Sequence, residues 1–179
     1  MDIYKLKWTS LQAEIFSLMC VKAGEKLSQR EIAKILKVSP TAVANSIKGL
    51  KESQLIQVEK TKTINFVSFN RDKKIAIELK RAENLKNIYI SGLFDYLEKE
   101  FAGGTIILFG SYSRGEDTNT SDVDIAVIGR KDKMIEIEKY EKILNRKINI
   151  NFYDSWKDIH KHLKNNILNG IILWGSVEL

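Results

Sequence analysis

The sequence predicts an α/β (α+β) fold in two unlike parts, and three observations support this prediction. Residues 1–70 hold three short stretches of helical periodicity, followed by two β-rich stretches. Residues 71–100 continue a helical pattern without a proline. From residue 101 to residue 179, apolar β-rich runs alternate with helical stretches, as in a mixed sheet with helices packed on it. We therefore expect one domain at 1–70, a connecting helix at 71–100 and a second domain at 101–179.

The composition is typical of a globular protein in a reducing compartment. Of the 179 residues, 44% are hydrophobic and 29% are charged. Cys20 is the only cysteine, which excludes an internal disulfide. The first residues lack the apolar run of a secretory leader, and no stretch reaches a membrane-spanning length. We expect a cytoplasmic protein.

Three helix starts can be recognised in the first part of the chain. The first helix begins at Thr9 or Ser10, either of which can cap it. Ser28 and Glu31 have the spacing of a capping box and open the second helix. Ser39 caps the third helix, and the only proline of the chain follows it in the first turn. Two short helices joined by a tight turn predict a helix-turn-helix.

Two β-rich stretches at 55–60 and 63–69 follow these helices and predict a hairpin with a basic tip. Three helices followed by such a hairpin resemble a winged helix-turn-helix. This resemblance implies DNA contacts from the exposed face of the third helix and from the wing. The candidate DNA-binding residues are Thr41, Asn45, Lys48, Lys51, Lys60 and Lys62.

The charge distribution favours a polyanionic partner for the first part. Residues 1–70 contain 11 Lys/Arg against 6 Asp/Glu, whereas residues 102–179 contain 11 of each. Most of the formal net charge of +6 therefore lies in the first part. The alternative is a winged helix that only contacts proteins, with its lysines forming a solvated face.

The helical segment after the hairpin is expected to start at Asn70 or Asp72 and to last to about Glu100. Gly92 is its only weak point, and a break at 82–84 is a second option. Such a helix either connects the two domains or supplies a dimer seam. Its later part, from about Leu85, is expected to pack on the sheet of the second domain.

Residues 105–127 contain the strongest functional signal. An apolar strand at 105–109 runs directly into Gly110 and Ser111. A glycine there allows a close approach to a phosphate, and a helix starting at Ser111 would direct free N–H groups at the same anion. A second apolar strand opens with Asp122 and Asp124, whose side chains face the same way because they are two residues apart.

Two neighbouring carboxylates at a strand start predict a divalent metal site. Like charges repel when they are buried together, and Mg²⁺ with its preference for oxygen ligands relieves that repulsion. Such a site can promote displacement at phosphorus. The alternative is a pair of solvated acids in a polar loop.

The same residues carry a resemblance to a known family. Gly110-Ser111, ten intervening residues and then Asp122-x-Asp124 resemble the signature of the minimal nucleotidyltransferases, small members of the DNA polymerase β-type superfamily. The resemblance implies that Gly110 and Ser111 hold a nucleoside triphosphate and that both aspartates are catalytic and ligate Mg²⁺. It implies transfer of a nucleoside monophosphate to an acceptor hydroxyl with release of pyrophosphate.

Arg114 is a further candidate for nucleotide binding. It stands three residues after Ser111 and could reach phosphate oxygens. The alternative is an ion pair with Glu116 or Asp117.

One position departs from the family pattern. The family usually carries a third acid on the strand predicted at 147–152, but the candidates there are Asn149 and Asn151, and we align Asn149 with the acid. An amide cannot take a proton and is a poorer metal ligand than a carboxylate. Three outcomes are open: catalysis by two acids and water, rescue by Asp154, or nucleotide binding with weakened chemistry.

The remaining segments are expected to complete the sheet domain. We predict helices at 134–144 and 155–168 and a last strand at 171–174, with Trp174 in the core. His160 and His162 have no acidic or cysteine partner at metal-ligand spacing and are expected at the surface.

The function predicted from the sequence is Mg²⁺-dependent transfer of a nucleoside monophosphate, AMP from ATP, by an enzyme tethered to a DNA-binding winged helix. One alternative is a DNA-binding regulator whose second domain binds nucleotide or a partner with little turnover. Another is an antitoxin that modifies a partner protein, so the acceptor could be a protein. A homodimer is expected only because winged helices often bind DNA as dimers.

Overall fold

The computed structural model describes residues 8–177, so the leader expectation for the first residues lies outside the described part. The chain divides into two compact units, with the boundary between Lys80 and Arg81. Helix α4 (Lys74–Ile90) contributes residues to both units. Within the described residues, none of the helices has the length and apolar character that a membrane crossing requires.

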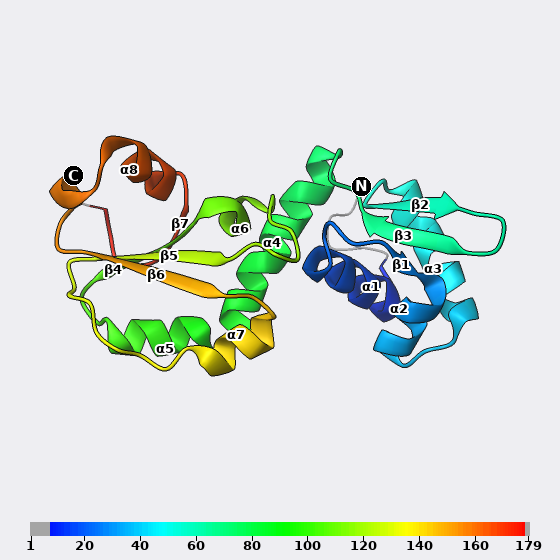
Figure 1. Ribbon diagram of the computed structural model, residues 1–179, viewed down its shortest axis with the longest axis horizontal. Helices are drawn as coiled ribbons and strands as arrows, with labels where there is room; N and C mark the ends of the chain where they lie inside the picture. Colours follow the sequence, from blue (N-terminus) through cyan, green and yellow to red (C-terminus); the bar gives the residue numbers. More distant parts are fainter. Residues whose placement is uncertain (1–7, 178–179) are drawn as a thin grey trace. The chain divides into compact units, whose positions relative to one another are not determined.

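The first unit has the element order of a winged helix-turn-helix, which confirms the predicted fold. Its elements are α1 (Ser10–Val21), β1 (Leu27–Ser28), α2 (Gln29–Leu36), α3 (Pro40–Glu52), β2 (Ile56–Lys60) and β3 (Asn65–Phe69). Its strands pair antiparallel in the order β1-β3-β2, and β2 and β3 form the wing hairpin (Figure 1). The two-residue strand β1 was not predicted, because it exists only through its pairing with β3.

All three predicted helix caps are present. The side chains of Thr9, Ser28 and Ser39 each accept a hydrogen bond from a backbone N–H in the first turn of their helix, at 3.2, 3.2 and 3.1 Å. Thr9 and Ser28 belong to complete capping boxes. The Ser28 backbone N–H donates to Glu31 in return, which lowers the pKa of that carboxyl group.

The predicted connecting helix is interrupted at its glycine. Helix α4 ends at Ile90, and α5 (Leu93–Glu100) begins after Gly92, which has a φ of +75°. The prediction of one helix lasting to Glu100 is therefore wrong. The chain turns at Gly92, because glycine tolerates the left-handed backbone conformation. No break occurs at 82–84, where α4 is continuous.

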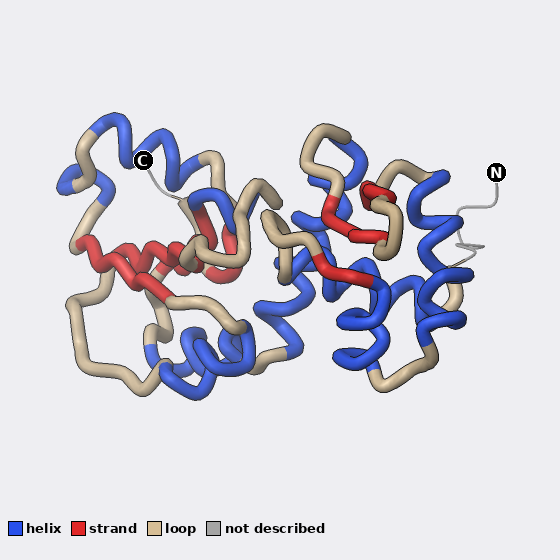
Figure 2. Tube along the Cα trace, turned by 45° about the vertical axis from the view of Figure 1, so that its right-hand side comes forward, coloured by secondary structure: helices blue, strands red, loops and turns tan. Residues whose placement is uncertain are grey.

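The second unit is built on a four-stranded mixed sheet, as predicted. Its further elements are β4 (Thr105–Phe109), α6 (Gly110–Arg114), β5 (Val123–Ile128), α7 (Glu138–Leu144), β6 (Ile148–Tyr153), the 3₁₀ turn η1 (Trp156–Asp158), α8 (Lys161–Leu168) and β7 (Ile171–Trp174). The strand order is β6-β5-β4-β7. Strands β5 and β6 are parallel, whereas β4 pairs antiparallel with both β5 and β7. Figure 2 shows these strands in red.

Helices cover both faces of this sheet (Figure 1). On one face, Val123, Ile125 and Val127 pack with side chains of α5 and α7. On the other face, Ala126 and Ile128 pack with side chains of η1 and α8. Because side chains alternate along a strand, Asp122 and Asp124 belong to the face that carries η1 and α8. They lie at the end of β5 where that cover is incomplete, since Asp122 is exposed and Asp124 is half-buried.

Three predicted segments of the second unit differ in detail. Helix α7 begins at Glu138 rather than at residue 134, and the helix predicted at 155–168 is divided into η1 and α8. Trp174 is 42% exposed rather than part of the core, because β7 is an edge strand of the sheet. His160 and His162 are exposed, as expected.

Candidate active site

Strand pairing places the glycine of the predicted phosphate turn directly beside the second aspartate. Phe109, the last residue of β4, is the register partner of Asp124 on β5. Gly110 follows with a φ of +74°, and a Cβ atom at this position would lie 2.4 Å from Oδ2 of Asp124. Only glycine satisfies both the left-handed backbone and the lack of space.

The turn after β4 is a single helical turn. Helix α6 begins at Gly110, one residue before the predicted start, and ends at Arg114, after which Gly115 adopts the left-handed conformation. Ser113 is buried, and its hydroxyl donates to the Gly110 carbonyl oxygen at 2.9 Å. Ser111 is half-buried. The Ser113 bond holds the turn in shape.

The two aspartates and Asn149 lie together. Asn149 is the register partner of Asp124 in the parallel β5–β6 pair. Its Nδ2 donates to Oδ2 of Asp122 at 3.1 Å and to Oδ1 of Asp124 at 3.3 Å. The amide therefore offsets part of the repulsion between the two carboxylates.

The donor set suits a divalent ion such as Mg²⁺. One oxygen of each aspartate lies within hydrogen-bond distance of the same nitrogen atom, so the two oxygens converge on one region. A cation in that region would have two carboxylate ligands, and Asn149 could add its carbonyl oxygen after rotation of the amide. Among the described residues, no group of three or more His, Cys, Asp or Glu side chains could hold a metal ion. The candidate site therefore offers only two acids, Asp122 and Asp124.

Asp154 lies too far away to replace the missing acid. It follows β6 at the end opposite to Asn149, because Tyr153 at the end of β6 pairs with Ile128 at the end of β5. Five residues of extended strand separate it from Asn149, roughly 16 Å at about 3.3 Å per residue. The fold therefore does not support the option that Asp154 replaces the third acid.

Arg114 forms one of the two ion pairs that were considered for it. Its Nε donates to Glu116 at 2.8 Å, and its Nη1 donates to Oδ1 of Asn166 at 3.1 Å. The side chains of Arg114 and Glu116 are 39% and 52% exposed, so this pair is weak and can exchange for a phosphate partner.

A buried polar network beneath the loop at 115–121 was not predicted. Asp117 lies 3.6 Å from Nη2 of Arg146, and both side chains are almost fully buried. Nδ2 of Asn84 donates to Asp117 at 2.7 Å and to the Tyr112 carbonyl oxygen at 2.9 Å. Burial and the nearby Asp117 carboxylate raise the pKa of Tyr112. The sequence pattern around Asp117 indicates only a loop. The tertiary structure alone brings Arg146 beneath it.

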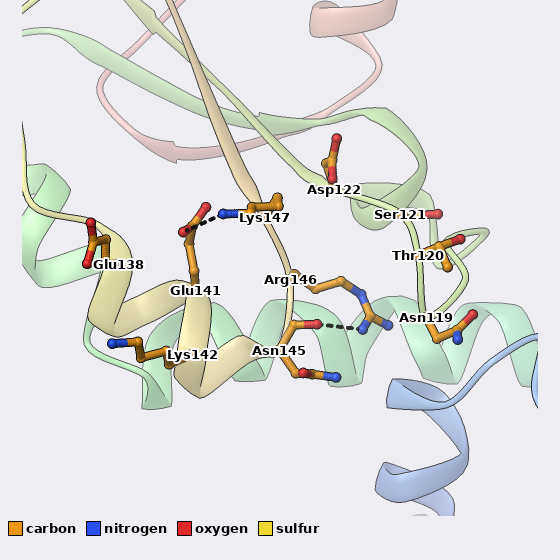
Figure 3. Close-up of a pocket in the computed structure, with 10 residues that line it drawn as sticks. All are labelled: Asn119, Thr120, Ser121, Asp122, Glu138, Glu141, Lys142, Asn145, Arg146 and Lys147. Carbon is orange, nitrogen blue, oxygen red and sulfur yellow. Dashed lines mark hydrogen bonds and ion pairs between the residues drawn. The ribbon is translucent and has the colours of Figure 1, made fainter.

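A polar cavity of about 620 Å³ opens beside Asp122 (Figure 3). Residues 119–122 line one side, and α7 lines the other. Arg146 and Lys147 lie between them. No sequence motif marks this cavity, because α7 and the 119–122 loop are remote along the chain.

The candidate DNA-binding residues are accessible. Thr41, Asn45 and Lys48 are exposed on α3 at spacings of four and three residues, and they therefore share one face. Nζ of Lys48 donates to Oδ1 of Asn45 at 3.4 Å. Lys51 is also exposed, as are Lys60 and Lys62 on the wing.

Comparison with known proteins supports the reading of the second unit. A family model described as "Nucleotidyltransferase domain" matches residues 90–173, which include all of the acidic and glycine positions above. A "Putative protein adenylyltransferase" of Methanocaldococcus jannaschii is 39% identical over 67 residues, covering 35% of this chain and 69% of the relative. The chain belongs to the nucleotidyltransferase domain family. Nucleotidyltransferase membership agrees with the mixed sheet and with the Gly110 turn.

Several solved structures match part of this chain. A ZitR variant of Lactococcus lactis matches with a TM-score of 0.40 and 24% identity, covering 55% of this chain and 65% of its own. Another ZitR variant, in complex with DNA, matches with a TM-score of 0.41 and 22% identity, covering 57% and 68%. AdcR of Streptococcus pyogenes has a TM-score of 0.42 and 18% identity, covering 57% and 72%. The chain thus spans about 65% of the first of these structures. At these scores the likeness carries no argument, and the winged-helix description rests on element order and strand pairing.

Gly110→Ala should destabilise the second unit more than Gly→Ala at a position where the added Cβ atom meets no other atom. The left-handed backbone costs about 1–2 kcal/mol for an L residue, and overpacking against Asp124 adds about 1–3 kcal/mol. Gly129→Ala is the matched control, because Gly129 has a φ of +77° and nothing within 4 Å of its Cβ position. Urea unfolding of the full chain measures both variants. Equal losses of stability would show that the space beside Asp124 is not restrictive.

Asn149→Asp should make stability depend on divalent cations. A third carboxylate would replace the amide donor beside two existing ones, at a cost of about 1–2 kcal/mol without metal. Mg²⁺ should restore the loss by binding the folded state. Asn151→Asp, which adds the same charge two residues further along β6, is the control. Thermal unfolding with and without Mg²⁺ tests this, and an equal Mg²⁺ effect on both variants would contradict the proposed ligand geometry.

Proposed function

We propose that the protein transfers AMP from ATP to an acceptor hydroxyl in a Mg²⁺-dependent reaction, and that its winged helix tethers this activity to DNA. The first unit would be the DNA-binding domain and the second the catalytic domain. The observation that carries the proposal is the close packing of Gly110 against Asp124, with Asp122 and Asp124 converging on one region.

Residues of the turn after β4 would hold the nucleotide. Gly110 allows the triphosphate to approach the backbone closely, and Ser111 offers its N–H and hydroxyl groups. Arg114 would exchange Glu116 for a phosphate oxygen, to which its planar guanidinium is well suited. Asp122 and Asp124 would hold Mg²⁺, which supplies charge neutralisation at the α-phosphate and at the leaving pyrophosphate.

The reaction forms one bond and breaks one. The acceptor oxygen attacks the α-phosphorus of ATP, and the bond from that phosphorus to the bridging oxygen breaks, so that pyrophosphate leaves. The acceptor proton passes to water, because Asn149 cannot accept it and Asp154 lies at the other end of β6. Loss of a dedicated base predicts slow turnover, since general base catalysis typically contributes about 10²–10⁴-fold.

A protein is the acceptor that we propose. The relative from Methanocaldococcus jannaschii carries the name of a protein adenylyltransferase, and this supports both ATP as donor and a protein hydroxyl as acceptor. The antitoxin role considered from the sequence would be one case of such a modification.

DNA binding by the first unit is proposed from exposed residues and charge. Thr41, Asn45 and Lys48 form a polar face on α3 that suits the major groove, and the wing lysines suit backbone phosphates. The excess of 11 Lys/Arg over 6 Asp/Glu in residues 1–70 supports a polyanionic partner. We also propose a homodimer, because winged helices often bind DNA as dimers.

A second candidate function is a DNA-binding regulator with little turnover. The amide of Asn149 favours it, because Nδ2 donates to both aspartates and, in the alignment that we propose, a neutral side chain replaces the third acid of the family. In this case Asn149→Asp would raise activity, and Lys48 and Lys51 would matter more to function than Asp122.

Asp122→Asn and Asp124→Asn should each reduce transfer by roughly 100-fold or more, because each removes a ligand charge that the transition state requires. The assay incubates the full chain with Mg²⁺, α-labelled ATP and cell extract and follows macromolecular label and pyrophosphate. Asp132→Asn, at an exposed turn, is the control with the same charge change. Unchanged transfer in both site variants would refute the enzyme, whereas ATP binding without transfer in the wild type would support the regulator.

Lys48→Ala combined with Lys51→Ala should weaken DNA binding and reduce its salt dependence. Each phosphate contact contributes about 0.9 to the slope of log K against log salt, so the slope should fall by up to about 1.8. Lys99→Ala with Lys157→Ala removes the same charge from exposed positions of the second unit and serves as the control. Titration of duplex DNA at several salt concentrations measures both, and identical slopes would exclude α3 from the interface.

A further inference from the structure

The cavity beside Asp122 is positioned to receive the acceptor. It has a volume of about 620 Å³, and Asp122 is part of its wall (Figure 3). Lys147, which also lines it, lies two residues before Asn149 on the same strand segment. A group bound in the cavity would therefore stand next to the carboxylates that act on the α-phosphate.

The residues that line the cavity are all of polar or charged type, and their charges are balanced. Three acids and three bases contribute, and the other lining side chains are hydroxyls and amides, with no aromatic ring among them. The charged residues are Asp122, Glu138, Glu141, Lys142, Arg146 and Lys147. A single-stranded nucleic acid needs a positive groove with aromatic stacking platforms, which this lining lacks. Hydroxyl and amide groups instead suit the backbone and polar side chains of a polypeptide.

Most of these charges already have partners. The backbone N–H of Ile148 donates to Glu141 at 3.0 Å, and Nζ of Lys147 lies 3.4 Å from the same carboxylate. Arg146 is buried against Asp117 and donates to the Asn145 carbonyl oxygen at 2.9 Å. These contacts leave Glu141, Lys147 and Arg146 already engaged with other groups of the protein.

Glu138 and Lys142 are the charges that remain for a ligand. Both are exposed, and within the described part of the chain they form no ion pair or side-chain hydrogen bond. They are four residues apart on α7, so they lie on one face of the helix about 6 Å apart. A ligand that pairs with both must present one basic and one acidic group.

We propose that this cavity is the docking site for the acceptor polypeptide. Glu138 and Lys142 select a segment that carries a basic and an acidic side chain beside the hydroxyl to be modified. This inference rests on the proposed adenylyl transfer and adds to it the site and the charge pattern of the acceptor. The hydroxyl oxygen attacks the α-phosphorus, pyrophosphate leaves and the proton passes to water, as in the proposed reaction.

The test reverses the two charges without changing the net charge. Glu138→Lys combined with Lys142→Glu is compared with the wild type and with Lys131→Glu combined with Asp132→Lys. The control residues are exposed and outside the cavity. Each protein is incubated with Mg²⁺, α-labelled ATP and cell extract, and the initial rate of label incorporation into macromolecules is measured over a range of extract concentrations. Half of each sample is treated with nuclease before the label is counted, so that label on protein is distinguished from label on nucleic acid. Calorimetry gives the Kd for Mg·ATP.

The reversed variant should lose at least tenfold in incorporation at low extract concentration and recover toward the wild-type rate at high concentration. Its Mg·ATP Kd should stay within twofold of the wild type, and the control variant should behave as the wild type. Wild-type rates in the reversed variant would overturn the docking site. So would an equal loss of ATP affinity, which would assign the cavity to the nucleotide, or label found only in material that nuclease removes. If the wild-type protein transfers no label to any extract, the proposed function itself is refuted. This result is obtained before the variants are compared, so it is distinct from a failure of the docking site.

Discussion

The candidate site depends on the pairing of β5 with two different neighbours. Antiparallel pairing with β4 sets Gly110 beside Asp124, and parallel pairing with β6 sets Asn149 across from the same residue. A shift of either register by one residue would turn the polar side chains to the opposite face of the sheet, because side chains alternate along a strand. The hydrophobic contacts of Val123, Ile125 and Val127 with α5 and α7 therefore also determine where the carboxylates point.

A buried ion pair secures the loop that joins the two halves of this site. Asp117 lies between the Gly110 turn and Asp122 in the sequence, and Arg146 immediately precedes the segment that enters β6. Breaking such a pair is costly, because the remaining charge stays buried without its partner. The pair thus links the phosphate turn and the first aspartate to the strand that carries Asn149, and Asn84 on α4 extends the link.

The two units differ in net charge. The first unit carries most of the positive charge and presents it on an exposed helix face and a wing, which suits a partner with many phosphates. The second unit is nearly neutral and places Asp122 and Asp124 at one strand end, where the amide of Asn149 donates a hydrogen bond to each. Because that amide is neutral, the site carries less repulsion than a third carboxylate at the same place would create.

Local patterns in the sequence determined the helix caps at Thr9, Ser28 and Ser39, the apolar strands of the sheet, and the positions of the glycine turn and of the two aspartates at strand ends, because each depends on residues close in the chain. The break at Gly92 was visible there only as a weak point. The tertiary structure alone decided the two-residue strand β1, the buried Asp117–Arg146 pair, the exposure of Trp174 and the cavity beside Asp122. These features join segments that are far apart in the sequence, and their energies come from pairing and burial that no local pattern records.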